Sequence, residues 1–166
     1  MGTGALSSRF ACRAGKVRLH TGDGEIRLRD LKGEVDIGSG DGHIEVEGVD
    51  GTVKAHSGDG RIRAQGRFDA LDISTSDGRI EAEAVAGSAI GQGWDLKTGD
   101  GSVSLTVPEN FAADVTLHTG DGHITLEMPV TVQGRYDSNN VHGKLNGGGG
   151  PLTIHTGDGS IRLGKS

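Results

Sequence analysis

The sequence predicts an all-β fold, a single-chain parallel β-solenoid (β-helix) built from stacked rungs of about 18 residues each. Three observations support this fold class. A short phrase recurs along the chain, apolar and polar residues alternate around each copy, and the 166 residues include 31 glycines but only 3% aromatics. A core with so few aromatic side chains is filled by Val, Ile, Leu and Ala. Of these, the β-branched residues Val and Ile favour strands. The length fits one domain spanning residues 1–166.

The phrase Thr/Ser-x-Asp-Gly occurs seven times and sets the period. The first four copies, which contain Asp23, Asp41, Asp59 and Asp77, are evenly spaced by one period. The next two intervals are slightly longer, and the last is close to two periods. Residues 133–151 fill this last interval, and we expect them to form an irregular rung. Residues 1–15 precede the first repeat and are a candidate N-terminal cap.

Apolar residues flank every copy of the phrase at fixed offsets. Val53 and Ala55 stand six and four residues before Asp59, and Ile62 and Ala64 stand three and five residues after it. The same offsets are apolar in all seven copies, which indicates half-buried strands on both sides of a turn. A propeller blade needs about 40 residues, and a β-meander does not require the same residue type at the same offset in every repeat. A solenoid does, because equivalent residues stack rung on rung.

The glycine that follows each aspartate is predicted to close the corner of a rung. Glycine has no Cβ and adopts positive φ readily, and the preceding aspartate can accept backbone N–H bonds within the turn. The predicted corner glycines are Gly24, Gly42, Gly60, Gly78, Gly101, Gly122 and Gly159.

Stacked rungs would align the aspartates into a column, which is a candidate calcium site. Its members are Asp23, Asp41, Asp59, Asp77, Asp100 and Asp121, with Asp158 as a further member. Calcium prefers carboxylate and carbonyl oxygens. The favoured interpretation is that the carboxylates cap turn amides and face solvent, because calcium-binding β-rolls use a different, nine-residue phrase. We therefore predict no cofactor, with calcium as the alternative.

Two further columns are predicted to stabilise the stack. The Thr or Ser that begins each phrase is expected to satisfy backbone groups at the corner. Outward charges alternate in sign on successive rungs, as at Arg27, Glu45 and Arg63, and are expected to form cross-strand pairs that fix the register.

Composition and motifs exclude several classes of function. The net charge is −6 and the basic residues are scattered, so binding to nucleic acid or to an anionic membrane surface is not expected. Cys12 is the one cysteine, which excludes an internal disulfide. No apolar run is long enough to insert into a membrane, and no signal or anchor is visible. No nucleophile elbow, phosphate loop or zinc-protease motif occurs, so no catalytic residue and no enzymatic activity are predicted.

Departures from the repeat are the candidate binding loops, because irregular segments of repeat proteins often carry specificity. One is the insertion at residues 86–93, before the only tryptophan, and the others are residues 107–113 and 133–151. The candidate contact residues in these loops are Trp94, Phe111, Tyr136, Asn139 and Asn140.

The repeat G-x-V-x-I-x-[TS]-G-D-G-x-I-x-[VL], seen at residues 33–46 and 51–64, resembles the putative-adhesin family of β-strand repeats, also called the toastrack domain. The ending VHGKLNGGG at residues 141–149, followed by LTIHTGDGSI at 152–161, is similar to the C-terminal end of that family. The resemblance covers residues 17–163. It implies a right-handed β-helix at the bacterial cell envelope, with a role in adhesion or envelope-stress sensing, and it supplies no catalytic residues.

Three functional hypotheses follow. The first is a non-enzymatic, envelope-associated module that binds an envelope glycan or a protein partner and is located outside the cytoplasm. The alternative is a self-assembling structural protein, because the end of a solenoid offers unpaired strand groups for end-to-end association. A carbohydrate-active enzyme is the least favoured and would require a cluster of carboxylates in a groove.

Overall fold

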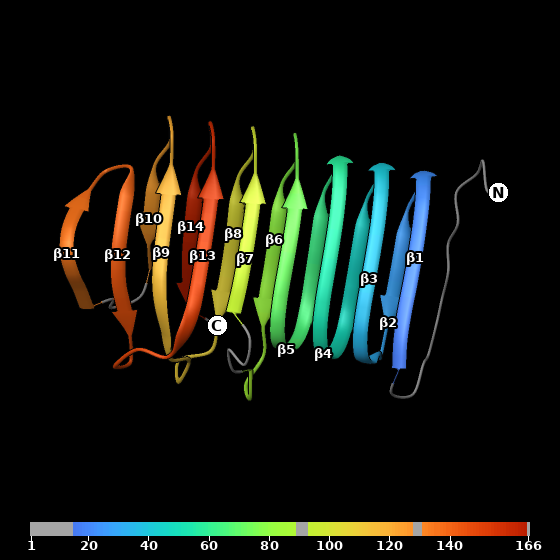
Figure 1. Cartoon of the computed structure of the whole chain (residues 1–166), viewed down its shortest axis with the longest axis horizontal. Coiled ribbons are helices and arrows are strands. Elements are labelled where there is room, and N and C mark those ends of the chain that lie inside the picture. The colour runs from blue at the N-terminus through green and yellow to red at the C-terminus, as the bar shows by residue number, and fades with distance from the viewer. Residues whose placement is uncertain (1–14, 89–92, 128–130, 166) are drawn as a thin grey trace.

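The computed structural model describes residues 15–88, 93–127 and 131–165, and its regular structure consists of 14 strands in one sheet (Figure 1). The chain is a β-helix, as the sequence predicts. Within the described residues, no helix long and apolar enough to span a membrane is found. The candidate cap lies outside these residues except for Gly15.

The coil is flattened into two layers joined by the rung corners (Figure 1). The front layer holds the strands that precede the corners: β1 (Gly15–Asp23), β3 (Lys32–Asp41), β7 (Gly93–Thr98), β9 (Ala113–Thr119) and β13 (Gly150–Thr156). The back layer holds those that follow them: β2 (Ile26–Arg29), β6 (Ile80–Ala84), β8 (Val103–Val107), β10 (Ile124–Leu126) and β14 (Ile161–Lys165). Two long strands, β4 (Ile44–Asp59) and β5 (Ile62–Thr75), run from the back layer into the front layer.

Neighbouring rungs pair in parallel, like residue on like residue. Val35 of β3 lies beside Val53 of β4, and Ile26 of β2 lies beside Ile44 of β4, so each pair joins equivalent positions of consecutive repeats. This register places the predicted apolar columns in the interior, where their side chains are buried in the inner rungs. At the two ends of the described stack, Val17 and Ile124 are only partly buried.

The order of rungs in space differs from their order in the chain. β13 lies between β7 and β9, and β14 lies between β8 and β10, so the last rung separates two that are consecutive in sequence (Figure 1). The stretch 133–151, expected to be an irregular rung, instead contributes most of an antiparallel hairpin and the start of β13. The hairpin consists of β11 (Thr131–Asp137) and β12 (Asn140–Leu145), and β12 pairs antiparallel with β9. This stretch lacks the corner phrase, so its chain turns back at Ser138 and Asn139.

Close stacking, rather than positive φ, explains the corner glycines. A Cβ added to Gly60 would overlap the carbonyl oxygen of Gly42 in the rung beside it, and the same overlap recurs at Gly42, Gly78, Gly101, Gly122 and Gly159. Among the predicted corner glycines, Gly24 alone has a positive φ, of 152°. The expectation that a positive φ requires glycine is therefore wrong for the other six corners. Glycine is required there because a Cβ would overlap the neighbouring rung.

Trp94 and Phe111 lie in the core, which corrects their interpretation as binding-loop residues. Each is 1% exposed. Trp94 stands in the same column as Leu71 and contacts two rings: Phe68, with centroids 5.9 Å apart, and Phe111, with centroids 4.8 Å apart. The interior beside these insertions is therefore filled by the three aromatic side chains of Phe68, Trp94 and Phe111.

The predicted hydroxyl column is buried and is only partly hydrogen-bonded. Four of its threonines donate to glycine carbonyls at the corners of adjacent rungs: Thr75 to Gly58 (3.0 Å), Thr98 to Gly78 (3.3 Å), Thr119 to Gly159 (2.9 Å) and Thr156 to Gly101 (3.0 Å). Thr21, Ser39 and Ser57 have no partner among the described residues. In these three rungs the strand continues to the aspartate instead of ending at the hydroxyl residue, so the two corner geometries differ.

Replacing Thr156 by Val should lower the free energy of unfolding by about 1 kcal/mol, because the Gly101 carbonyl loses its hydroxyl donor in a partly buried corner. The same replacement at Thr21 removes no hydrogen bond and should change stability by less than about 0.5 kcal/mol. Urea unfolding followed by circular dichroism measures both. Equal losses of unfolding free energy in the two variants would show that the Thr156 hydrogen bond does not stabilise its corner.

Outward charges form some of the predicted cross-strand pairs, but among the described residues Arg63, the register partner of Glu45, makes no ion pair. Arg29 Nε lies 3.4 Å from Glu47 Oε2, and Arg27 Nε lies 3.6 Å from Glu45 Oε2. The hydrogen bond from Arg27 to Glu25 (2.6 Å), with the negative charges of Glu25, Glu45 and Glu47, raises the pKa of Arg27 above its ordinary value. These pairs are exposed, so they contribute more to the register of the rungs than to stability.

Candidate binding groove

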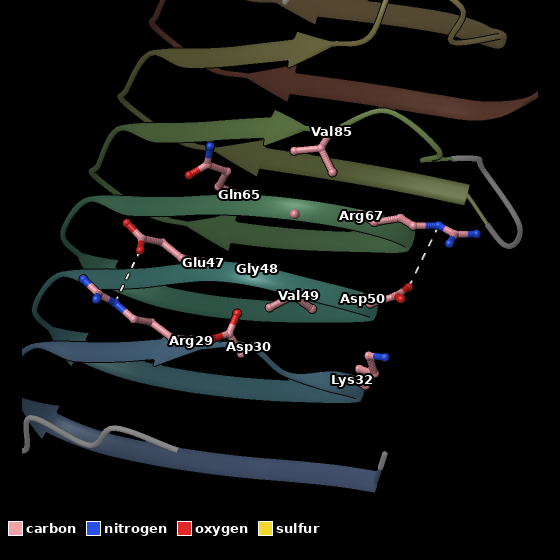
Figure 2. Close-up of a pocket in the computed structure, with 11 residues that line it drawn as sticks. Arg29, Asp30, Lys32, Glu47, Gly48, Val49, Asp50, Gln65, Arg67 and Val85 are labelled. Carbon is pink, nitrogen blue, oxygen red and sulfur yellow. Dashed lines mark ion pairs between the residues drawn. The ribbon is translucent and has the colours of Figure 1, made fainter. Parts of the chain in front are cut away.

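An open groove of about 660 Å³ runs across several rungs where the back layer passes into the front layer (Figure 2). It lies at the opposite end of the strands from the Asp-Gly corners. Its lining residues are Arg29, Asp30, Lys32, Glu47, Gly48, Val49, Asp50, Gln65, Gly66, Arg67 and Val85. They are contributed by strands β2 to β5, the turns between them, and the residue that follows β6.

The groove is hollow because two glycines occupy its centre. Gly48 has no register partner in β5, because a bulge there pairs Glu47 with Gln65 and Val49 with Gly66. A Cβ on Gly66 would overlap the backbone of Val49, and one on Gly48 would lie 2.9 Å from Asp30 Oδ1. Asp30 and Gly48 also have positive φ, of 54° and 67°. The tight stacking therefore excludes side chains here and leaves charged residues to form the walls.

The walls carry equal numbers of basic and acidic side chains. The basic residues are Arg29, Lys32 and Arg67, and the acidic residues are Asp30, Glu47 and Asp50. Two cross-strand ion pairs lie along the groove: Arg29 with Glu47 at 3.4 Å, and Arg67 with Asp50 at 4.0 Å (Figure 2). The lining thus offers hydrogen-bond donors and acceptors of both charge signs.

Arg67 also fixes one edge of the groove. Its Nε donates to the carbonyl of Gly87 at 3.0 Å, which ties the chain after β6 to β5. Val85, in the same turn, is 38% exposed and gives the rim an apolar surface. Among the described residues, no aromatic side chain lines the groove, so these residues offer no flat ring on which a neutral sugar would stack.

Two of the three groove carboxylates are engaged by arginines. General acid–base chemistry requires carboxyl groups positioned against a substrate, whereas Glu47 and Asp50 each face an arginine of a neighbouring rung. The arrangement is suited to binding through charge and hydrogen bonds.

The aspartate column lies away from the groove and is exposed. Asp23, Asp41 and Asp59 are register partners on successive rungs, and every aspartate of the column faces solvent. In the part of the chain that the structure describes, no group of three or more His, Cys, Asp or Glu side chains is arranged to hold a metal ion. Calcium binding by this column stays an untested alternative.

The hairpin residues proposed from the sequence also lie outside the groove. Asn139 Nδ2 donates to the Gly120 carbonyl (2.6 Å), and the Asn139 carbonyl accepts from the Thr119 N–H (2.9 Å), so Asn139 holds the hairpin against a corner. Asn140 pairs with His118, whose ring stacks on that of His155 at 4.9 Å. Tyr136 belongs to β11, and its side chain lies outside the described part of the structure.

Sequence reasoning did not find the groove. Its residues flank the third apolar position of each repeat, which the repeat pattern marks only as a second corner. The available signal was a glycine one or two residues before that position, Gly48 in one rung and Gly66 in the next.

The model of the family described as Toastrack DUF4097 matches residues 12–164. The chain belongs to the Toastrack family. A crystal structure at 1.95 Å resolution of a putative cell adhesion protein from Clostridium sporogenes ATCC 15579 is similar to this Toastrack chain, with a TM-score of 0.64 and 10% identity over 93% of each chain. At this identity, the likeness establishes the shared fold. No curated protein matches the chain.

Proposed function

We propose that this Toastrack chain is a non-enzymatic binding module of the cell envelope and that the groove is its contact site. The observation that carries the proposal is a hollow with charges of both signs, built on a rigid stack of hydrogen-bonded rungs. Family membership and the fold shared with a protein described as a putative cell adhesion protein support a role in attachment outside the cytoplasm.

The chemistry of the lining favours a protein segment as the partner. Three basic and three acidic residues balance one another, so a ligand with charge of a single sign gains little net attraction. A polypeptide presents both signs together with backbone donors and acceptors, and it can also contact the apolar rim at Val85. A bare envelope glycan would find no stacking surface among the described lining residues.

Reversing two groove charges, with Lys32→Glu and Arg67→Glu, should weaken binding to isolated bacterial envelopes at least about tenfold, because like charges then face each other along the groove. Co-sedimentation of the protein with the envelopes measures the affinity. The matched control is Lys97→Glu on the front layer, paired with Asp95 at 3.2 Å and distant from the groove, which should bind like the original chain.

Treating the envelopes with protease beforehand separates the two partner classes. Loss of binding supports a protein partner, and retained binding that still depends on Lys32 and Arg67 supports a glycan. Equal affinities of the groove variant and the Lys97→Glu control would contradict the groove as the contact site.

A self-assembling structural protein is a second candidate. It is favoured by the partial exposure of core columns at both ends of the described stack, at Val17 and Leu19 and at Ile124 and Leu126. Stacking of one end on another would bury these side chains.

A further inference from the structure

The rung formed by β13 and β14, residues 150–165, fills a slot between two rungs that the chain builds consecutively. We call residues 150–165 the inserted rung. One wall of the slot is β7 with β8, and the other is β9 with β10 (Figure 1). In the front layer, β13 pairs with both walls. Leu152 of β13 lies beside Trp94 of β7 on one side and beside Val115 of β9 on the other. β14 pairs in the same way with β8 and β10.

The inserted rung is held by contacts with these walls. Its inward side chains, Leu152, Ile154, Ile161 and Leu163, are fully buried. Hydroxyl bonds connect both walls to it, from Thr156 to the Gly101 carbonyl and from Thr119 to the Gly159 carbonyl. None of these contacts involves the turn that joins β12 to β13, so they are independent of how the inserted rung is covalently connected.

The connecting turn, residues 146–149, is short and contains three consecutive residues with positive φ. Asn146, Gly147 and Gly148 have φ values of 48°, 89° and 88°, and such a conformation at the non-glycine Asn146 costs about 1 kcal/mol. Asn146 offsets part of this cost by donating to the carbonyls of Glu109 and Phe111, each at 2.9 Å. The turn carries the chain from one side of β9 to the other. A short connection that carries strain, here at Asn146, favours exchange of the connected element.

We propose that the inserted rung is exchanged between two copies of this chain, so that each copy fills the slot of the other. Every wall contact of the single chain is retained in such a dimer, because an identical segment presents identical partners. Only the turn changes, from a tight crossing with Asn146 at positive φ to an extended connection. Four extended residues span at most about 14 Å, so the two copies meet at the edge of the stack that carries residues 146–149.

A pair of engineered cysteines distinguishes exchange from any other association. Asp95 and Thr153 are register partners across the slot wall and are both half-buried on the outer surface. Asp95→Cys and Thr153→Cys, combined with Cys12→Ser, place two thiols on adjacent strands at a separation that a disulfide can bridge. The protein is refolded at low and at high concentration, separated by size with light scattering, and oxidised.

We expect refolding at high concentration to yield a species of twice the monomer mass that stays a covalent dimer in denaturing gels without reductant. The monomer, in contrast, should carry the disulfide within one chain and run as a monomer. A control pair, Asp95→Cys with Thr116→Cys, should not crosslink, because both residues flank Thr153 from opposite walls of the filled slot.

Three results would overturn the proposal. One is a dimer that separates into monomers in the denaturing gel, which means that each chain fills its own slot. Another is a mass that stays monomeric at every concentration at which the chain is soluble. A mass that grows beyond the dimer while the disulfides stay within single chains would also reject exchange, and it would support end-to-end stacking instead.

Discussion

Gly60→Ala is expected to lower the free energy of unfolding by about 3–5 kcal/mol, which is a large share of the stability of a domain of this size. The new Cβ would overlap the carbonyl oxygen of Gly42. This carbonyl belongs to a corner whose strands are paired on both sides, so it cannot move without separating the rungs. Overpacking against backbone is costlier than overpacking against a side chain, which can rotate away.

Gly22→Ala is the matched control for this substitution. Gly22 lies in the same phrase of the first rung, and a Cβ there would meet no atom within 4 Å. Its effect should stay within about 1 kcal/mol in either direction. Urea unfolding of both variants, followed by circular dichroism, makes the comparison. A Gly60→Ala protein as stable as the Gly22→Ala protein would show that the rungs are less closely stacked than the structure indicates.

Trp94→Ala is expected to cost about 3–5 kcal/mol, because it removes the largest buried ring of the core and leaves a cavity between Phe68 and Phe111. Trp94→Phe should cost less than half as much. It retains an aromatic ring in the column, and it removes an indole N–H that has no hydrogen-bond partner among the described residues. Circular dichroism is the appropriate measurement, since both variants lack the only tryptophan.

Binding measurements add an independent check on Trp94. A core residue affects binding only through stability, so the folded Trp94→Phe protein should bind bacterial envelopes like the original chain. A Trp94→Phe protein of unchanged stability that no longer binds would instead support the sequence-based interpretation of Trp94 as a contact residue.

Local pattern was sufficient to predict the rungs. Stacked rungs place equivalent residues beside one another, so a column such as Val35, Val53 and Leu71 must be apolar throughout and can be recognised in the sequence. The corner glycines follow from the same repetition, although their cause is contact with the neighbouring rung. The alternating outward charges were predictable because parallel pairing joins residues at a fixed offset.

The order of the rungs was not predictable from the same pattern. The phrase at residues 154–163, IHTGDGSIRL, is nearly the same as LHTGDGHITL at residues 117–126, so either could stack on the β7–β8 rung. The choice is made by the hairpin β11–β12, which occupies the other edge of β9. The groove could not be predicted from the sequence for a related reason. It depends on a bulge at Gly48, which becomes apparent only when β4 is paired with β5.

Because of the inserted rung, the strand pairs of this molecule differ in how far apart the paired residues lie along the chain. Val35 and Val53 pair across a single repeat, whereas the whole of residues 95–151 lies between the partners Trp94 and Leu152. Contacts between distant segments carry a larger loop-closure cost and slow folding. The rungs from β1 to β5 can therefore form while the chain is still being synthesised. The strands β9 and β10 can join the stack only after residues 150–165 have left the ribosome, because β13 and β14 connect them to β7 and β8. A chain interrupted just before these residues would expose the edges of β8 and β10.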